Sequence, residues 1–181
     1  MILDEIKYFA KYVNKEVLRR MFSLTPKDNL AEYEALKDYM DELDADIIPD
    51  LAEYIFSSNE EVIRERLRNM KGYFLMFEYG AFAGSVPNSA GVREGSMGMS
   101  LIIGCKPNQP THDNVSEAIV MDKCFQFLTT IKAHMEEDNK ELCASRRINE
   151  SSYNISPAEP SFIFGCVGWV MTFNRANNLI A

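Results

Sequence analysis

Two apolar runs lie at the middle of the chain: GYFLMFEYGAFAG at residues 72–84 and MGMSLIIGC at residues 97–105. In the second run the apolar side chains fall on alternate positions, which is the period of a strand with one face on a core. These residues are Met97, Met99, Leu101, Ile103 and Cys105. The first run is largely apolar on both faces. The pair predicts a long β-hairpin at the centre of an antiparallel sheet, and because a hairpin alone is not stable in water, other segments must cover it.

The first 70 residues carry helical patterns. Apolar residues recur at spacings of three and four over residues 2–24, which predicts one amphipathic helix, and again over residues 30–47, which predicts a second. Pro49 then begins a short helical piece, and the capping-box spacing at residues 58–61 begins another helix. We therefore predict a helical region at residues 1–70 without strands and an α+β region at residues 71–181, which together form one compact domain.

The C-terminal third supplies the cover and the last strand. Residues 113–139 predict a long helix, with Asp113 as its N-cap, that packs on one face of the sheet. Residues 153–155 predict a short edge strand, and residues 161–173 predict a buried final strand followed by a tail. Gly165 and Gly168 within that strand indicate a bulge or a close approach of backbones. The expected fold class is α+β.

Net charge, hydropathy and cysteine spacing indicate which partners and which compartment to expect. The formal net charge is −8, and an acidic surface repels phosphate backbones, so we expect no direct binding of nucleic acid. No apolar run is long enough to span a bilayer, so we expect no membrane association. The four cysteines lack CxxC spacing and the first residues lack a signal-peptide pattern. Both observations favour a cytoplasmic protein.

No motif for catalysis or metal binding is present. The nearest approach to a calcium loop is Asp44, Asp46 and Asp50, but residues 47–49 place Ile-Ile-Pro where ligands would be needed. The two histidines, His112 and His134, have no metal-ligand spacing, and His134 is placed to interact with the C-terminal dipole of the long helix. We predict no catalytic residue, no cofactor and no metal ion.

The segment between the two hairpin strands is longer than a tight turn requires. It is either a surface loop or an arm that becomes ordered on a neighbouring subunit. On the second interpretation its apolar and polar residues form an interface. These are Val86, Pro87, Asn88, Val92 and Arg93. Trp169, in the final strand, is expected in the core.

The order of these segments carries a resemblance. The residues concerned are FLMFEY (74–79), residues 97–105, IKAHMEED (131–138) and GCVGWVMTF (165–173). Strand, loop, strand, long helix, irregular segment and glycine-bearing strand resemble the tail-terminator and tail-completion proteins at the head-to-tail joint of bacteriophages, and related prophage proteins. The resemblance covers about residues 72–174, and the helical first 70 residues depart from the shorter family pattern. It implies a non-enzymatic ring subunit, a homo-oligomer that docks on other protein subunits through its sheet edges and hairpin arm and is assembled into a virion or phage-like particle.

Two other functions remain open from the sequence. One is a small-molecule-binding or enzymatic domain with a pocket between the N-terminal helices and the sheet, in which Glu78 or His112 would hold the ligand. The other is a cytoplasmic adaptor that binds a basic partner through the acidic second helix.

Overall fold

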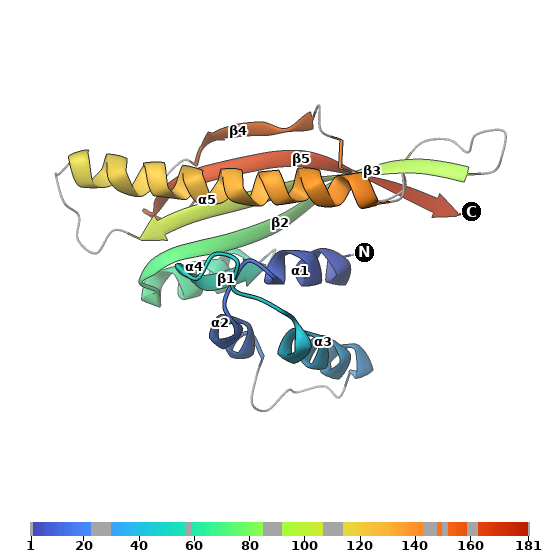
Figure 1. The fold of residues 1–181 in the computed structure, drawn as a ribbon, viewed down its shortest axis with the longest axis horizontal. Coiled ribbons are helices and arrows are strands. Elements are labelled where there is room, and N and C mark those ends of the chain that lie inside the picture. Colours follow the sequence, from blue (N-terminus) through green and yellow to red (C-terminus); the bar gives the residue numbers. More distant parts are fainter. Residues whose placement is uncertain are drawn as a thin grey trace.

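A five-stranded sheet with strand order β1-β2-β3-β5-β4 runs through the middle of the molecule (Figure 1). The computed structural model describes residues 2–22, 30–56, 59–84, 92–106, 114–142, 148–149, 152–158 and 163–180. The strands are β1 (Leu51–Phe56), β2 (Gly72–Gly84), β3 (Val92–Lys106), β4 (Asn154–Pro157) and β5 (Val167–Ile180). The helices are α1 (Ile2–Ala10), α2 (Lys15–Arg20), α3 (Ala31–Glu42), α4 (Glu60–Asn69) and α5 (Asn114–Glu141). This is the predicted α+β fold.

The predicted hairpin is confirmed in β2 and β3, which pair antiparallel from Gly72 with Lys106 to Gly84 with Gly95. β5 lies on the other side of β3 and pairs with it over its full length, also antiparallel. The short edge strand expected near residue 154 is confirmed as β4, which pairs with β5. β3 is therefore the central strand.

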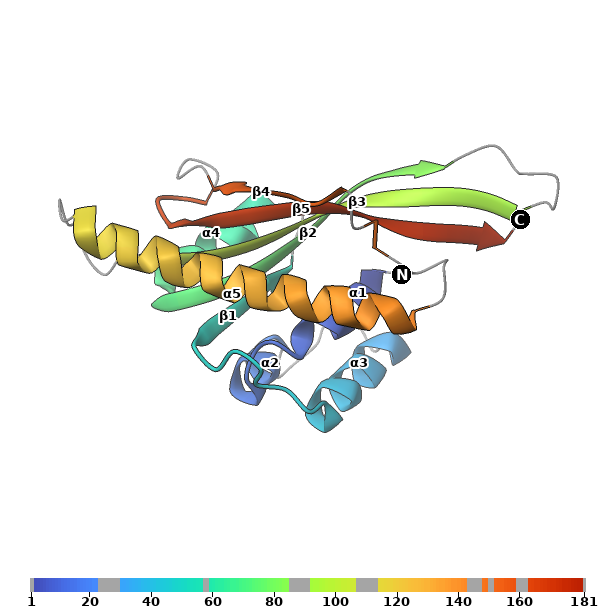
Figure 2. The ribbon, with the colours of Figure 1, turned by 45° about the horizontal axis from the view of Figure 1, so that its top comes forward.

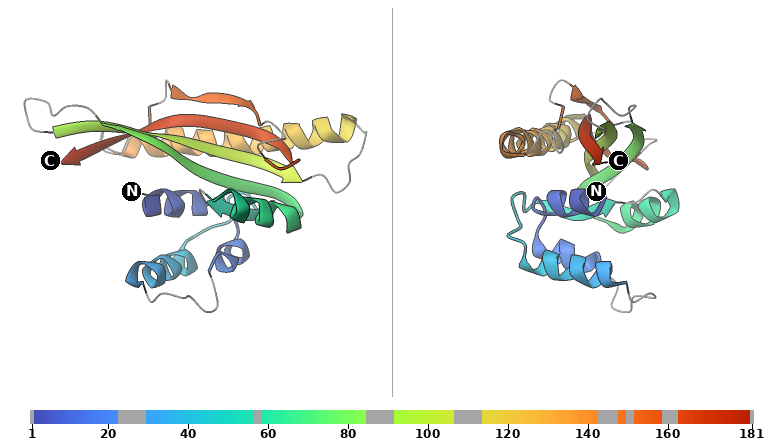
Figure 3. Two further views of the ribbon diagram at one scale, coloured as in Figure 1. Left: turned by 180° about the vertical axis from the view of Figure 1, so that it is seen from behind. Right: turned by 90° about the vertical axis from the view of Figure 1, so that its right-hand side faces the viewer.

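Different helices cover the two faces of the sheet. The predicted long helix, α5, lies along one face (Figure 2), where Leu128, Ile131 and Met135 are buried. α1 packs on the same face, with the ring centre of Phe9 5.2 Å from that of Phe77. The opposite face is covered by α4 and by residues 163–166, which pack in a second apolar cluster. The side view in Figure 3 shows α5 and α4 on different sides of the strands.

The prediction that the first 70 residues contain no strand is wrong. Residues 51–56 form β1, which pairs parallel with the first half of β2. Leu51, Tyr54 and Ile55 have a spacing that fits a helix, but a short apolar run fits a buried strand equally well. The strand forms because Tyr54 is fully buried and its hydroxyl donates to the carbonyl of Ile6 at 2.9 Å. The sheet is therefore mixed.

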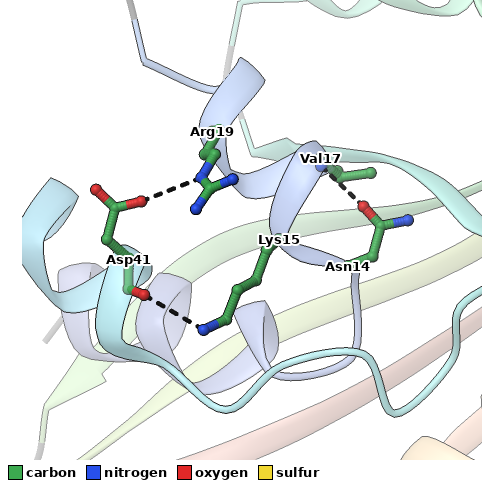
Figure 4. A network of polar contacts seen from close by, with 5 residues as sticks. All are labelled: Asn14, Lys15, Val17, Arg19 and Asp41. Atoms are coloured by element: carbon green, nitrogen blue, oxygen red, sulfur yellow. Dashed lines mark hydrogen bonds and ion pairs between the residues drawn. The ribbon is translucent and has the colours of Figure 1, made fainter.

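The first predicted helix is divided into α1 and α2. The break follows from Asn14, whose Oδ1 accepts from the backbone N–H of Val17 at 2.9 Å and so begins a new helix (Figure 4). In the same view Lys15 Nζ donates to the Asp41 carbonyl, and Arg19 Nε lies 3.4 Å from Asp41 Oδ1, which fixes α2 against the end of α3.

Four predicted boundaries also change. α3 ends at Glu42 instead of residue 47, because residues 46–48 leave the helix and donate backbone hydrogen bonds to residues 11–13. α5 ends at Glu141, two residues beyond the predicted end. Residues 163–165 form a turn in which Gly165 has φ +79°, so β5 begins only at Val167. The expected tail at residues 174–178 is instead a continuation of β5.

The predicted caps Asp113 and Ser58 lie outside the described residues. Asn59 caps α4.

The predicted close approach at Gly168 is confirmed where β3 and β5 cross the covered end of the sheet. A Cβ on Gly168 would lie 2.2 Å from the Ile103 carbonyl oxygen and 2.6 Å from the Gly104 Cα. A Cβ on Gly104 would lie 2.4 Å from the ring of Phe74. Gly168 thus allows the backbones of β5 and β3 to approach closely, and Gly104 makes room for an aromatic ring on one face of the sheet.

Candidate interaction surface: the three-stranded arm

β2, β3 and β5 continue past the ends of α1 and α5 as a three-stranded ribbon (Figures 1–3). We call residues 80–84, 92–98 and 174–180 the arm. It begins at a bulge, where the β2–β3 register shifts between Tyr79 and Phe82. A bulge bends a strand and increases its twist, so the arm leaves the body at the point where the helices end.

A buried ion pair fixes the base of the arm to α1. Arg175 Nε lies 2.8 Å from Glu5 Oε1, and the two side chains are only 9% and 7% exposed. The guanidinium also lies over the ring of Tyr8, 5.4 Å from its centre. Breaking a buried pair by removing one partner is strongly destabilising. The position of the arm on the body therefore depends on this contact.

A buried amide on α5 supports the same place from the other side. Asn139 accepts from the backbone N–H of Ile148 at 2.7 Å and donates to its carbonyl at 3.2 Å. Ile148 in turn forms an isolated antiparallel bridge with Arg175. In the described part of the chain this bridge is the last pairing on the outer side of β5.

The backbone groups on the outer side of β5, the side away from β3, can be assigned residue by residue. In an antiparallel strand the N–H and C=O of one residue point to the same side, and successive residues alternate. Asn174 points outward, because its carbonyl accepts from Asn149 at 2.9 Å and its N–H donates to Ser152 Oγ at 2.8 Å. By the same alternation Asn178 and Ile180 direct their N–H and C=O groups away from β3. Residues 177–180 are therefore an open strand edge, which we call the β5 edge.

The other side of the arm is open as well. β1 pairs with β2 only as far as Phe77, and no described residue pairs with the outer side of β2 beyond it. Residues 82–84 follow the bulge and pair regularly with β3. We call residues 82–84 the β2 edge.

The outer strands of the body are less accessible for pairing. β4 has only four residues and ends in Pro157. On β1, Arg20 donates to the Ala52 carbonyl at 2.9 Å, and Arg66 lies 3.1 Å from the Glu53 carboxylate. Short strands, prolines and charged side chains are the usual means of blocking an exposed edge. The β5 and β2 edges contain neither proline nor charge, so the arm is the part of the sheet best suited to accept another strand.

The predicted interface residues fall only partly on this surface. Val86, Pro87 and Asn88 lie outside the described residues. Val92 and Arg93 begin β3 and pair with Ile180 and Leu179 of β5. The sequence pattern thus located the hairpin, but it missed the third strand of the arm because residues 174–178 show no apolar alternation.

A polar cluster lies between α1 and α5 near the base of the arm. Asp138 accepts from Tyr8 at 2.7 Å and from Lys11 Nζ at 2.5 Å. Burial alone would raise the pKa of Asp138, but the hydrogen bonds from Lys11 and Tyr8 outweigh it and lower the pKa. Burial raises the pKa of Tyr8 and of Tyr12. Asp138 is thus ionised and the two tyrosines neutral at neutral pH, which suits a structural link between the helices better than proton transfer.

Other predicted residues are dispersed. Glu78 lies on β2, and burial raises its pKa. His134 is exposed and lies seven residues before the end of α5, outside its last turn, so the predicted interaction with the C-terminal dipole is wrong. Trp169 is partly buried; its Nε1 donates to the Met121 carbonyl at 3.0 Å. His112 lies outside the described residues.

An open groove lies between α2, β1 and α4. Its volume is about 640 Å³, and its charged lining residues are Arg20, Glu53, Glu65, Arg66 and Lys71. It lies beside the N-terminal helices as the small-molecule hypothesis requires, but Glu78 does not line it. Within the described ranges, no three His, Cys, Asp or Glu side chains are grouped so that they could hold a metal ion.

No protein-family model matches the sequence, and no curated protein sequence matches it significantly. None of the described helices is both long enough and apolar enough to cross a membrane.

Proposed function

We propose that this protein is a non-enzymatic structural subunit of a phage-like tail or injection assembly, and that it docks on neighbouring subunits through its arm. The observation that carries the proposal is the uncovered three-stranded arm with an open edge on each side, anchored to the body by the Glu5–Arg175 pair. Open edges pair readily with further strands. The resemblance to tail-terminator and tail-completion proteins supports the same function.

The mass in solution tests this proposal. We expect light scattering to show an oligomer at high protein concentration and electron microscopy to show rings with a central opening. A strict monomer at high concentration would remove the proposal.

The variant Asn178→Pro tests whether assembly depends on the arm. It removes an outward N–H of the β5 edge and leaves the hydrogen bonds between β5 and β3 intact, so we expect a folded protein with reduced mass. The control is Val115→Asp at the start of α5, far from the arm, where Val115 is 68% exposed, the highest fraction among the large apolar residues that the structure describes. Dissociation by the control but not by Asn178→Pro would place docking on α5 and contradict the proposal.

The groove supports a second candidate, the binding of a small anionic molecule. Arg20 donates to a backbone carbonyl and has no carboxylate partner among the residues that the structure describes, and Lys71 lines the same groove. Calorimetric titration with a panel of small phosphates and carboxylates tests it, with Arg20→Ala as the matched variant. Binding that Arg20→Ala abolishes would favour this candidate; no binding by the unmodified protein would remove it.

A further inference from the structure

We infer that the β5 edge of one copy pairs in parallel with the β2 edge of the next copy, so that the arms of successive copies form one closed ring of strands. This inference rests on the proposed function and specifies its interface. It names a second copy of this chain as the partner, both contact segments and their relative direction.

The direction follows from the strand order in the arm. β2 and β5 both run antiparallel to β3, so they run parallel to each other on opposite sides of it. When copies are related by rotation about an axis along the arm, the β5 edge of one copy meets the β2 edge of the next in the same direction. Such a contact is heterologous, and it closes into a ring when the rotation divides a full turn.

The register follows from the levels of the two edges. Gly84 of β2 and Asn177 of β5 both pair with Gly95 of β3, so the two residues lie at the same level along the arm. Residues that lie level on neighbouring strands have their side chains on the same face of the sheet, so copies related by rotation must be shifted by an even number of residues. A shift of four residues places Leu179 and Ile180 level with Phe82 and Ala83 of the next copy. Four residues rise about 13 Å and three strands span about 14 Å, so this shift corresponds to a strand tilt of roughly 43°. Closed rings of strands have tilts of about 35–45°, so the shift suits closure.

Composition favours the same pairing. The β2 edge reads FAG and the β5 edge, residues 177–180, reads NNLI, so no charge or proline opposes contact between them. Outward N–H and C=O groups of Asn178 and Ile180 provide the hydrogen bonds on one side. A two-fold contact between two β5 edges would leave the β2 edges open, whereas the heterologous contact uses both edges of every copy.

Disulfide trapping tests the inference. The double variant Phe82→Cys with Leu179→Cys places one thiol on each edge. Within one chain the two positions are two strands and four residues apart, roughly 16 Å, whereas a disulfide needs Cα atoms about 4.4–6.8 Å apart. Oxidation by diamide can therefore link them only between copies. Cys143 is replaced by Ser in every variant, and a second double variant, Ala83→Cys with Ile180→Cys, covers the case that the first does not fold.

The inference predicts a ladder of covalent multimers larger than a dimer on a non-reducing gel, absent from each single-cysteine variant. Dimers from Leu179→Cys alone would show two-fold pairing and overturn it. An oligomer by light scattering without cross-links in either folded double variant would overturn the edge pairing and leave the structural role standing. A monomer at high concentration would overturn both.

Discussion

The two ends of the same three strands are built differently. At the end where β5 begins, Gly104 pairs with Gly168 and makes room for the ring of Phe74, and helices or turns cover both faces. At the arm, the same strands pass beyond the helices and are fixed by polar contacts around Arg175. The covered end is thus stabilised by close apolar packing within one chain, and the arm has backbone groups left over for another chain.

The largest effect should come from the anchor of the arm. Glu5→Ala leaves Arg175 buried without its carboxylate, so we expect a loss of about 3–5 kcal/mol in the free energy of unfolding, measured by urea denaturation. The matched control is Glu60→Ala, which removes the exposed pair with Arg64 and should cost about 0.5 kcal/mol or less. Replacing both Glu5 and Arg175 by Met should recover much of the loss; equal effects of Glu5→Ala and Glu60→Ala would show that the buried pair does not hold the arm.

The covered end should tolerate an added methyl group poorly. Gly168→Ala forces its Cβ against backbone atoms of β3, and we expect a cost of about 1–3 kcal/mol. Gly80→Ala, at the start of the arm, brings a Cβ to 3.1 Å from the Gly98 carbonyl oxygen and should cost less. A larger loss for Gly80→Ala than for Gly168→Ala, by the same denaturation measurement, would reverse the comparison between the two ends.

A smaller effect should depend on pH. The folded pKa of Asp138 is below its ordinary value of 3.8, so its ionisation stabilises the fold above that value and the contribution disappears as the pH falls through the lower, folded pKa. Asp138→Asn should cost about 1 kcal/mol or less at pH 7, since the side chain is 39% exposed. The difference from the unmodified protein should shrink towards pH 3; a difference that grows on acidification would contradict the sign.

The smallest effect on stability is expected at the β5 edge. Asn178→Pro removes a backbone N–H that points away from β3. The free energy of unfolding of the monomer, measured by urea denaturation, should therefore change by less than about 0.5 kcal/mol. Leu179→Pro, one residue further on, removes a group that points to β3 and should cost more. Similar costs for the two variants would show that the alternation assigned to this strand is wrong.

The sequence predicted the parts of the fold that depend on local pattern. The alternation from Met97 to Cys105 located β3, and the long apolar stripe located α5. β1 was missed because six residues are too few to separate a helical from an extended period, and its burial depends on α1 and β2. The outer half of β5 was missed because its pairing with β3, not its own residues, makes it a strand. The site could be predicted only as a hairpin, since Glu5 and Arg175 meet across the whole length of the chain.

Amide hydrogen exchange, read residue by residue at low and high protein concentration, tests the central claim most directly. In dilute solution we expect Asn178 and Ile180 to exchange faster than Asn177 and Leu179, because only the latter two donate to β3. At concentrations where the oligomer forms, the amides of Asn178 and Ile180 should become as slow as their neighbours. Exchange rates at these four amides that do not change with concentration, while the mass does, would contradict the account.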